Sequence, residues 1–145
     1  MSINIAEVSD LTQGTLITPF APAAIFIDPL PEGTLNDDRT LSWRLTEGYD
    51  GPMVSPSATV IEVAEPSLGG PVPLWRYVVP LGVTEVEFPV LSAAAGATGL
   101  NGGFMLLNII PFLAEGRFEY DDFTYLDING SRWESYGISS TSFVE

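Results

Sequence analysis

Glycine and proline divide this chain into short segments in which apolar and polar residues alternate. Fourteen glycines and twelve prolines occur among its 145 residues. In residues 40–47, TLSWRLTE, the side chains of Leu41, Trp43 and Leu45 fall on one side of an extended backbone, and polar side chains fall on the other. This alternation predicts a β-strand with one buried face. The recurrence of such segments predicts an all-β domain.

Further segments with this alternation or a β-branched composition are residues 23–27, 58–65, 74–79, 84–91, 103–116, 123–128 and 131–137. Segment 84–91 places Val86, Phe88 and Val90 inward and its two glutamates outward. Segment 103–116 is apolar at consecutive positions, which predicts a strand buried on both faces. No segment has the period of an amphipathic helix, so residues 90–100, with two glycines, are expected to form a loop.

Length and composition favour one folded domain. A chain of 145 residues has the usual size of a single domain, and 46% hydrophobic residues suffice for a core. The charge is one-sided, because 19 acidic residues face 5 basic ones, for a formal net charge of −14. Such a surface repels phosphate groups, so we expect neither nucleic acid nor an anionic membrane as a partner.

Missing residue types exclude several kinds of chemistry. The chain has no cysteine, histidine or lysine. It therefore cannot form a disulfide, a Ser-His-Asp triad, a Schiff base or a metal site with cysteine or histidine ligands. Carboxylates remain as catalytic groups, but among 19 acids some pair falls at a suitable distance by chance. We expect no enzyme, and we assign no catalytic, cofactor-binding or metal-binding residue and no cofactor.

Two features bear on location. The opening MSINIAEVSDLTQG lacks the basic and apolar regions of a secretory signal. The longest apolar stretch, residues 104–114, is interrupted by Asn108 and Pro111 and is too short to span a bilayer. We therefore expect no membrane insertion. The absence of cysteine leaves the compartment open, since it suits exported bacterial proteins, phage structural proteins and cytosolic proteins alike.

The order of these segments resembles the fibronectin type III family, most closely its bacterial members. Trp43 in LSW matches the family's buried second-strand tryptophan, and TEVEFPVL at 84–91 matches its fifth-strand segment. The resemblance covers residues 23–145. It implies an antiparallel two-sheet sandwich of about seven strands, an architecture that immunoglobulin-like domains share. Residues 1–22, with two prolines in TPFAPA, are expected to form an N-terminal arm or an edge strand.

The chain departs from the family pattern after the fifth strand. Residues 92–103, SAAAGATGLNGG, replace the compact turn and the corner tyrosine, and Phe104 stands near the tyrosine position. The tyrosine hydroxyl bond that the family makes there is therefore not carried over. The chain also has no Arg-Gly-Asp tripeptide, so integrin binding is not implied.

The segment FEYDDFTYLDINGSRW, residues 118–133, combines acids with a turn signal. Asn129-Gly130 favours a two-residue type I′ turn, which would place Asp127 opposite Arg132. The same turn would pair Leu126 with Trp133 and Tyr125 with Glu134. Replacing Gly130 with valine is then expected to destabilise the fold, because the turn needs positive φ. The sequon Asn-Gly-Ser in this turn needs no sugar to explain it.

The acids of this segment leave two interpretations open. Glu119, Asp121 and Asp122 form either a solvated acidic turn, which we favour, or a calcium site that is not of the EF-hand type. An EF-hand loop counted from Asp127 would lack its glycine at position six and its glutamate at position twelve. A second acidic group, with Glu32, Asp37 and Asp38, is explained by turn formation, with a metal as the alternative.

Aromatic residues suggest carbohydrate binding as an alternative. Trp75 and Tyr77 alternate on one strand face, and Trp133 and Tyr136 lie on the last predicted hairpin. An exposed pair could stack against sugar rings, whereas packing in the core is the competing interpretation. We favour core packing for all of them, and most firmly for Trp43.

The resemblance and the missing chemistry together predict a noncatalytic structural, adhesion or assembly module of a bacterial surface or exported protein. Its expected location is extracellular or at the cell surface, and its expected partner is another protein or a further copy of itself. One alternative is a structural subunit of a virion or filament, favoured by the N-terminal arm. The other is a carbohydrate-binding module.

Overall fold

The structure is a computed structural model. It describes residues 21–46, 55–89, 103–114, 118–124 and 133–144, and the backbone of residues 2–6. Within these residues the chain forms β-strands and one 3-10 turn at Tyr120–Asp122. The strands are β1 Ser2–Ala6, β2 Ala24–Asp28, β3 Thr40–Leu45, β4 Ala58–Glu65, β5 Val72–Pro80, β6 Glu85–Glu87, β7 Phe104–Ala114 and β8 Trp133–Val144.

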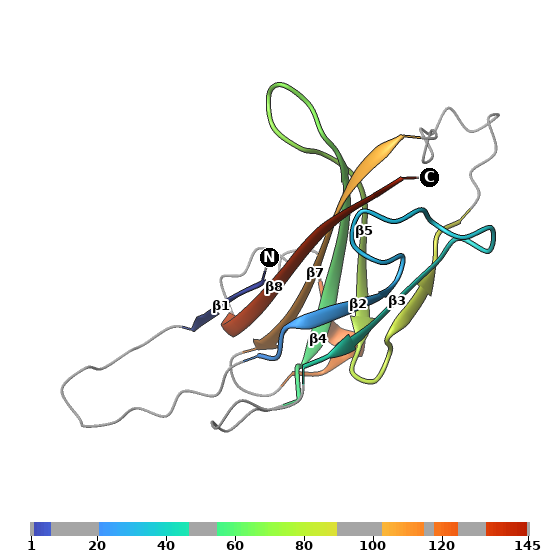
Figure 1. Cartoon of the computed structure of the whole chain (residues 1–145). Coiled ribbons are helices and arrows are strands. Elements are labelled where there is room, and N and C mark those ends of the chain that lie inside the picture. The colour runs from blue at the N-terminus through green and yellow to red at the C-terminus, as the bar shows by residue number, and fades with distance from the viewer. Residues whose placement is uncertain are drawn as a thin grey trace.

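The strands form two sheets (Figure 1). The larger sheet has the order β1-β8-β7-β4-β5, and the smaller has the order β2-β3-β6. Every strand pairing within them is antiparallel. The predicted all-β, antiparallel two-sheet sandwich is confirmed. Among the described residues no helix is long and apolar enough to cross a membrane.

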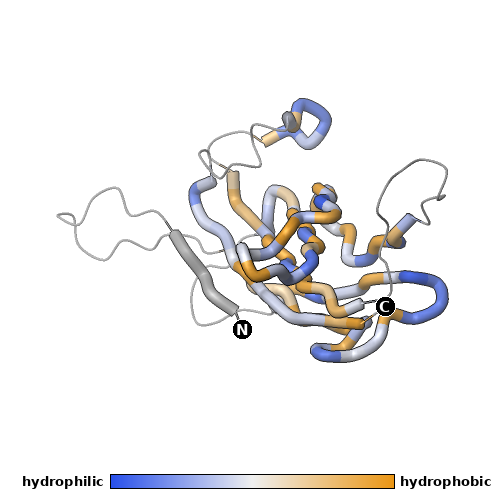
Figure 2. Tube along the Cα trace, turned by 90° about the horizontal axis from the view of Figure 1, so that it is seen from above, coloured by the Kyte–Doolittle hydropathy of each residue, from blue (hydrophilic) through white to orange (hydrophobic). Residues whose placement is uncertain are grey.

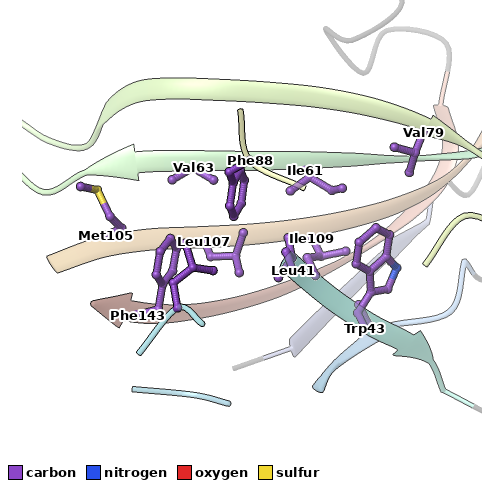
Figure 3. Packing of buried hydrophobic residues seen from close by; sticks show 12 residues of the cluster. Leu41, Trp43, Ile61, Val63, Val79, Phe88, Met105, Leu107, Ile109 and Phe143 are labelled. Atoms are coloured by element: carbon purple, nitrogen blue, oxygen red, sulfur yellow. The ribbon is translucent and has the colours of Figure 1, made fainter. Parts of the chain in front are cut away.

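Side chains from both sheets form the main core (Figure 3). Leu41 and Trp43 reach inward from β3, and Trp43 is only 1% exposed, which confirms its predicted place. Ile61 and Val63 of β4 meet them from the larger sheet. Figure 2 shows hydrophilic colour in several of the loops at the rim of the molecule. Alternation along each strand thus sorts its side chains between core and solvent.

Strand β7 is buried on both faces, as predicted. Leu107 and Ile109 belong to the main core between the sheets, whereas Ile110 and Phe112 belong to a second apolar cluster. That cluster lies on the opposite face of the larger sheet, because residues at odd and even positions of a strand point to opposite sides. The continuous apolar run of β7 reflects these two environments.

The last strand differs from the prediction. Segment 131–137 was expected to end the series, but β8 continues to Val144. At its start Trp133 pairs with Ala114 of β7. Phe123 and Thr124, which were expected to begin another strand, follow the 3-10 turn and are not in a strand. Local alternation did not predict these bounds, because they depend on pairing with the long strand β7.

Other predictions fall on residues that the structure does not describe. The Asn129-Gly130 turn, the Asp127–Arg132 pair and the loop at 90–100 lie outside the described residues. So does most of the N-terminal segment, of which Ser2–Ala6 forms the edge strand β1. The domain boundary at residue 22 stays a prediction.

Candidate functional site

The acidic segment at 118–124 is attached to the outer face of the larger sheet by aromatic rings. The rings of Phe112 in β7 and Phe118 pack edge-on, with their centroids 5.8 Å apart. The centroid of the Phe123 ring lies 6.1 Å from that of Phe112. Trp133 stacks on Phe112 at 4.5 Å. Phe118 and Phe123 thus bracket the 3-10 turn and anchor it over the second apolar cluster.

Between these anchors the turn exposes its acids. The Tyr120 hydroxyl donates a 2.6 Å hydrogen bond to the Val78 carbonyl, and the Phe123 N–H donates to the Tyr120 carbonyl at 3.1 Å. Asp121 and Asp122 are exposed. In the described part of the chain, no three Asp, Glu, His or Cys side chains converge as a metal site would need. The choice between a solvated acidic turn and a calcium site stays a prediction.

The second acidic group organises the approach to β3. The side chains of Asn36 and Asp38 each accept a hydrogen bond from the Thr40 N–H, at 3.1 and 3.0 Å. The Asn36 amide also donates to Asp28. These bonds support turn formation, which is the usual role of Asn and Asp in such loops. Glu32 and Asp37 are exposed on the same loop.

Trp75 and Tyr77 point into the sandwich. Their rings are nearly parallel, with centroids 6.1 Å apart, and Tyr77 lies 5.9 Å from the buried ring of Phe88. Both pack against the main core. Their ring faces are therefore engaged by protein, which supports core packing rather than sugar stacking. The rings of Trp133 and Tyr136 likewise contact each other within the second apolar cluster, with their centroids 5.5 Å apart.

Two polar atoms of this aromatic pair are buried without a hydrogen-bond partner: the Trp75 indole nitrogen and the Tyr77 hydroxyl. Burial raises the pKa of Tyr77, and the nearby positive charge of Arg39 partly offsets the rise. Desolvation disfavours the phenolate because its charge loses contact with water. The sequence predicted the shared face of Trp75 and Tyr77 but not these unpaired polar atoms.

An open groove of about 720 Å³ lies where the smaller sheet meets the end of β8. Ser140, Thr141 and Ser142 of β8 contribute to it, and most of the other lining residues are apolar. Those remaining residues are Ala24, Ile25, Phe26, Pro31, Glu32, Phe104 and Leu106. Phe104 is half exposed at this groove. No sequence pattern indicated this groove, because its walls come from four separate segments.

The inner face of β8 carries two buried serines that sequence reasoning missed. The Ser135 hydroxyl accepts a hydrogen bond from the Ala21 N–H at 3.1 Å, and the Ser139 hydroxyl accepts one from the Ala24 N–H at 3.0 Å. Both serines are 1% exposed. They hold the chain that enters β2 against β8 and thereby connect the two sheets. Their spacing of four residues along a strand was the available signal.

The sequence analysis did not predict the ion pair between β4 and β5. Arg76 of β5 lies opposite Glu62 of β4, and their side chains meet at 2.5 Å. Such a pair on a partly exposed sheet face contributes little to stability. It needs no ligand, and it could have been found from the β4–β5 register.

Comparisons with known proteins add no relative. No family model matches the chain, and no curated protein or solved structure shows a significant match.

Proposed function

We propose that the chain is a noncatalytic structural, adhesion or assembly module of the fibronectin type III-like, immunoglobulin-like kind. The arrangement of β2 to β8 carries the proposal. In an immunoglobulin constant domain the first, second, fifth and fourth strands form one sheet, and the third, sixth and seventh form the other. Numbered from β2, this chain has its first, second and fifth strands in one sheet and its third, sixth and seventh in the other. The fourth, β5, pairs with the third strand instead.

The positions that carry the resemblance support the same proposal. Trp43 lies on the second of these seven strands and is buried. Residues 85–87 form the fifth strand, with Glu85 and Glu87 exposed and Phe88 buried just after it. A bacterial surface or exported protein, with an extracellular location, is the setting that the resemblance suggests.

A noncatalytic role is consistent with the surroundings of five acidic side chains. Asp28 and Asp38 bond within turns, Glu62 pairs with Arg76, and Asp121 and Asp122 face solvent. Each of these roles is structural and needs no substrate. The fold alone does not dictate function, so the proposal rests on these side chains as well.

A subunit of a virion or filament is the second candidate, and one observation favours it. The N-terminal strand β1 adds to an edge of the larger sheet through pairing with β8 alone. Edge strands of this kind are a common route to contacts between chains.

Light scattering on the purified chain over a range of concentrations tests the proposal. An assembly module is expected to increase in mass with concentration, and a spacer is expected to remain a monomer. A glycan array run in parallel tests the carbohydrate alternative. Specific glycan binding that is lost in Trp75→Ala would contradict the proposed role and favour a carbohydrate-binding module.

A further inference from the structure

Strand β1 lies at the edge of the larger sheet and pairs with β8 alone. It pairs antiparallel with β8 from Ser2 opposite Ser139 to Ala6 opposite Ser135. Each sheet has its remaining strands paired without β1. The β8 edge therefore serves as a docking position for one extra strand.

The chain that follows β1 returns to the same point of β8. Ala6 lies opposite Ser135 in the strand pairing, and the Ala21 N–H donates to the Ser135 hydroxyl. A second bond, from the Ala24 N–H to the Ser139 hydroxyl, fixes the entry to β2. The entry to β2 thus has its own attachment to β8, separate from the β1 ladder. A strand from another chain could fill the β1 position while these bonds stay in place.

We propose that the β8 edge of one copy accepts the strand Ser2–Ala6 of a second copy. The inference rests on the proposed role in assembly and names the contact that would carry it. The exchanged ladder contains the same antiparallel backbone bonds as the ladder within one chain, so the second copy offers a partner that is already known to fit. Exchange of an identical element between copies is a low-cost route to association. Reciprocal exchange gives a closed dimer, and one-way exchange gives an open row of copies.

Protein concentration decides whether β1 pairs with the β8 edge of its own chain or with that of another copy. Because the connecting residues 7–20 tether β1 to its own chain, its effective concentration at its own β8 edge is on the order of millimolar. Each copy also carries a net charge of −14, so two copies repel at low salt. Dilute protein is therefore expected to keep β1 within the chain. Copies that are crowded together, in an array or at high concentration and salt, are expected to exchange it.

The absence of cysteine allows a direct test. Ile3 lies opposite Ile138 in the β1–β8 register. The Cα atoms of such antiparallel partners are about 4.5–5.5 Å apart, within the range that a disulfide bridges. One preparation carries Ile3→Cys and another carries Ile138→Cys. The two are mixed, refolded together from denaturant at rising concentration and salt, and oxidised. Covalent dimers are then measured by intact mass.

A matched control measures random collision. The control mixture combines Ile3→Cys with Leu68→Cys. Leu68 is fully exposed in the turn between β4 and β5, and β7 separates β8 from these two strands in the sheet. We expect the Ile3→Cys and Ile138→Cys mixture to give several-fold more covalent dimer than the control. We also expect this excess to grow with concentration. The double variant, at low concentration, should close its disulfide within one chain.

The outcomes separate the inference from the proposed function. Dimer yields at the control level at every concentration, with the double variant closing within one chain, would overturn the exchange. If light scattering still shows assembly in that case, the assembly role stands and another surface carries it. A chain that stays monomeric throughout, with control-level dimers, contradicts both the exchange and the assembly role and leaves a spacer or adhesion module. A double variant that forms no disulfide, together with control-level dimers, would show that β1 does not dock on β8 at all.

Discussion

The Tyr120 hydroxyl donates a hydrogen bond to the Val78 carbonyl, 42 residues earlier in the chain, at 2.6 Å. This bond joins the acidic 3-10 turn to β5 on the outer face of the larger sheet. The Val78 side chain belongs to the second apolar cluster, whereas Asp121 and Asp122 of the turn are exposed to solvent.

We expect Tyr120→Phe to lower the free energy of unfolding by about 0.5–1.5 kcal/mol, because one hydrogen bond is lost while the ring is kept. Chemical denaturation of the two proteins measures the difference. A difference below about 0.5 kcal/mol, the size of an ordinary surface substitution, would contradict a contribution of the Val78 bond to stability.

Calcium is expected to raise the melting temperature no more than sodium does at equal ionic strength. Asp121 and Asp122 are exposed, and only specific binding to the folded state stabilises it by mass action. Screening alone should help somewhat, because a net charge of −14 destabilises the compact chain. Thermal melts in matched salts measure the effect. A calcium-specific rise that disappears in the Asp121→Asn, Asp122→Asn variant would reveal a metal site.

Ser139→Ala is expected to destabilise the fold by about 1–3 kcal/mol, because it leaves the buried Ala24 N–H without its acceptor. Ser140→Ala is the matched control. Ser140 is the next residue of β8 and is exposed, and its hydroxyl donates to Asn108. Its loss should change the free energy of unfolding by no more than about 0.5 kcal/mol. Equal effects of the two substitutions would contradict the role of Ser139 in joining the sheets.

The two faces of β7 can be compared directly. Leu107→Ala removes a side chain from the main core, and Ile110→Ala removes one from the second apolar cluster. Both are buried, so each substitution should cost about 2–5 kcal/mol in the free energy of unfolding. Denaturant titrations measure both. A cost below about 0.5 kcal/mol for Ile110→Ala, the size of an ordinary surface substitution, would show that the outer face is open to solvent.

The stability of the protein should fall as the pH rises above the normal tyrosine pKa of about 10, in part through Tyr77. Burial raises the pKa of Tyr77 in the folded state, so the folded protein holds this proton to higher pH than the unfolded chain does. Its contribution is fully present below the unfolded pKa and is lost as pH rises toward the folded pKa. Denaturation at about pH 8 and about pH 11, in the protein and in Tyr77→Phe, isolates this residue.

Tyr77→Phe should show a smaller loss of stability over this pH range, because the group that titrates is gone. At neutral pH the same variant should be at least as stable as the parent protein, since the hydroxyl is buried without a partner. A large loss at neutral pH would mean that the hydroxyl has a partner in solution.

The sequence by itself determined most strands of the sandwich and the inward face of most of them, but not the bounds of β8. Leu41 and Trp43 are buried as their alternation predicts, and residues 58–65 form β4 within the predicted bounds. The physical reason is local, because side chains alternate along every extended backbone and a sheet with one buried face needs apolar residues at every second position.

Only the tertiary structure decided what covers each face. Ser135 and Ser139 belong to the interior because the chain entering β2 brings backbone N–H groups to their hydroxyls. Phe112 is buried on the outer face because Phe118 and Phe123 return to cover it. Periodicity reports which residues share a face, but it carries no information on which distant segment packs there. That choice depends on contacts between residues far apart in the chain, which form only when the sheets assemble.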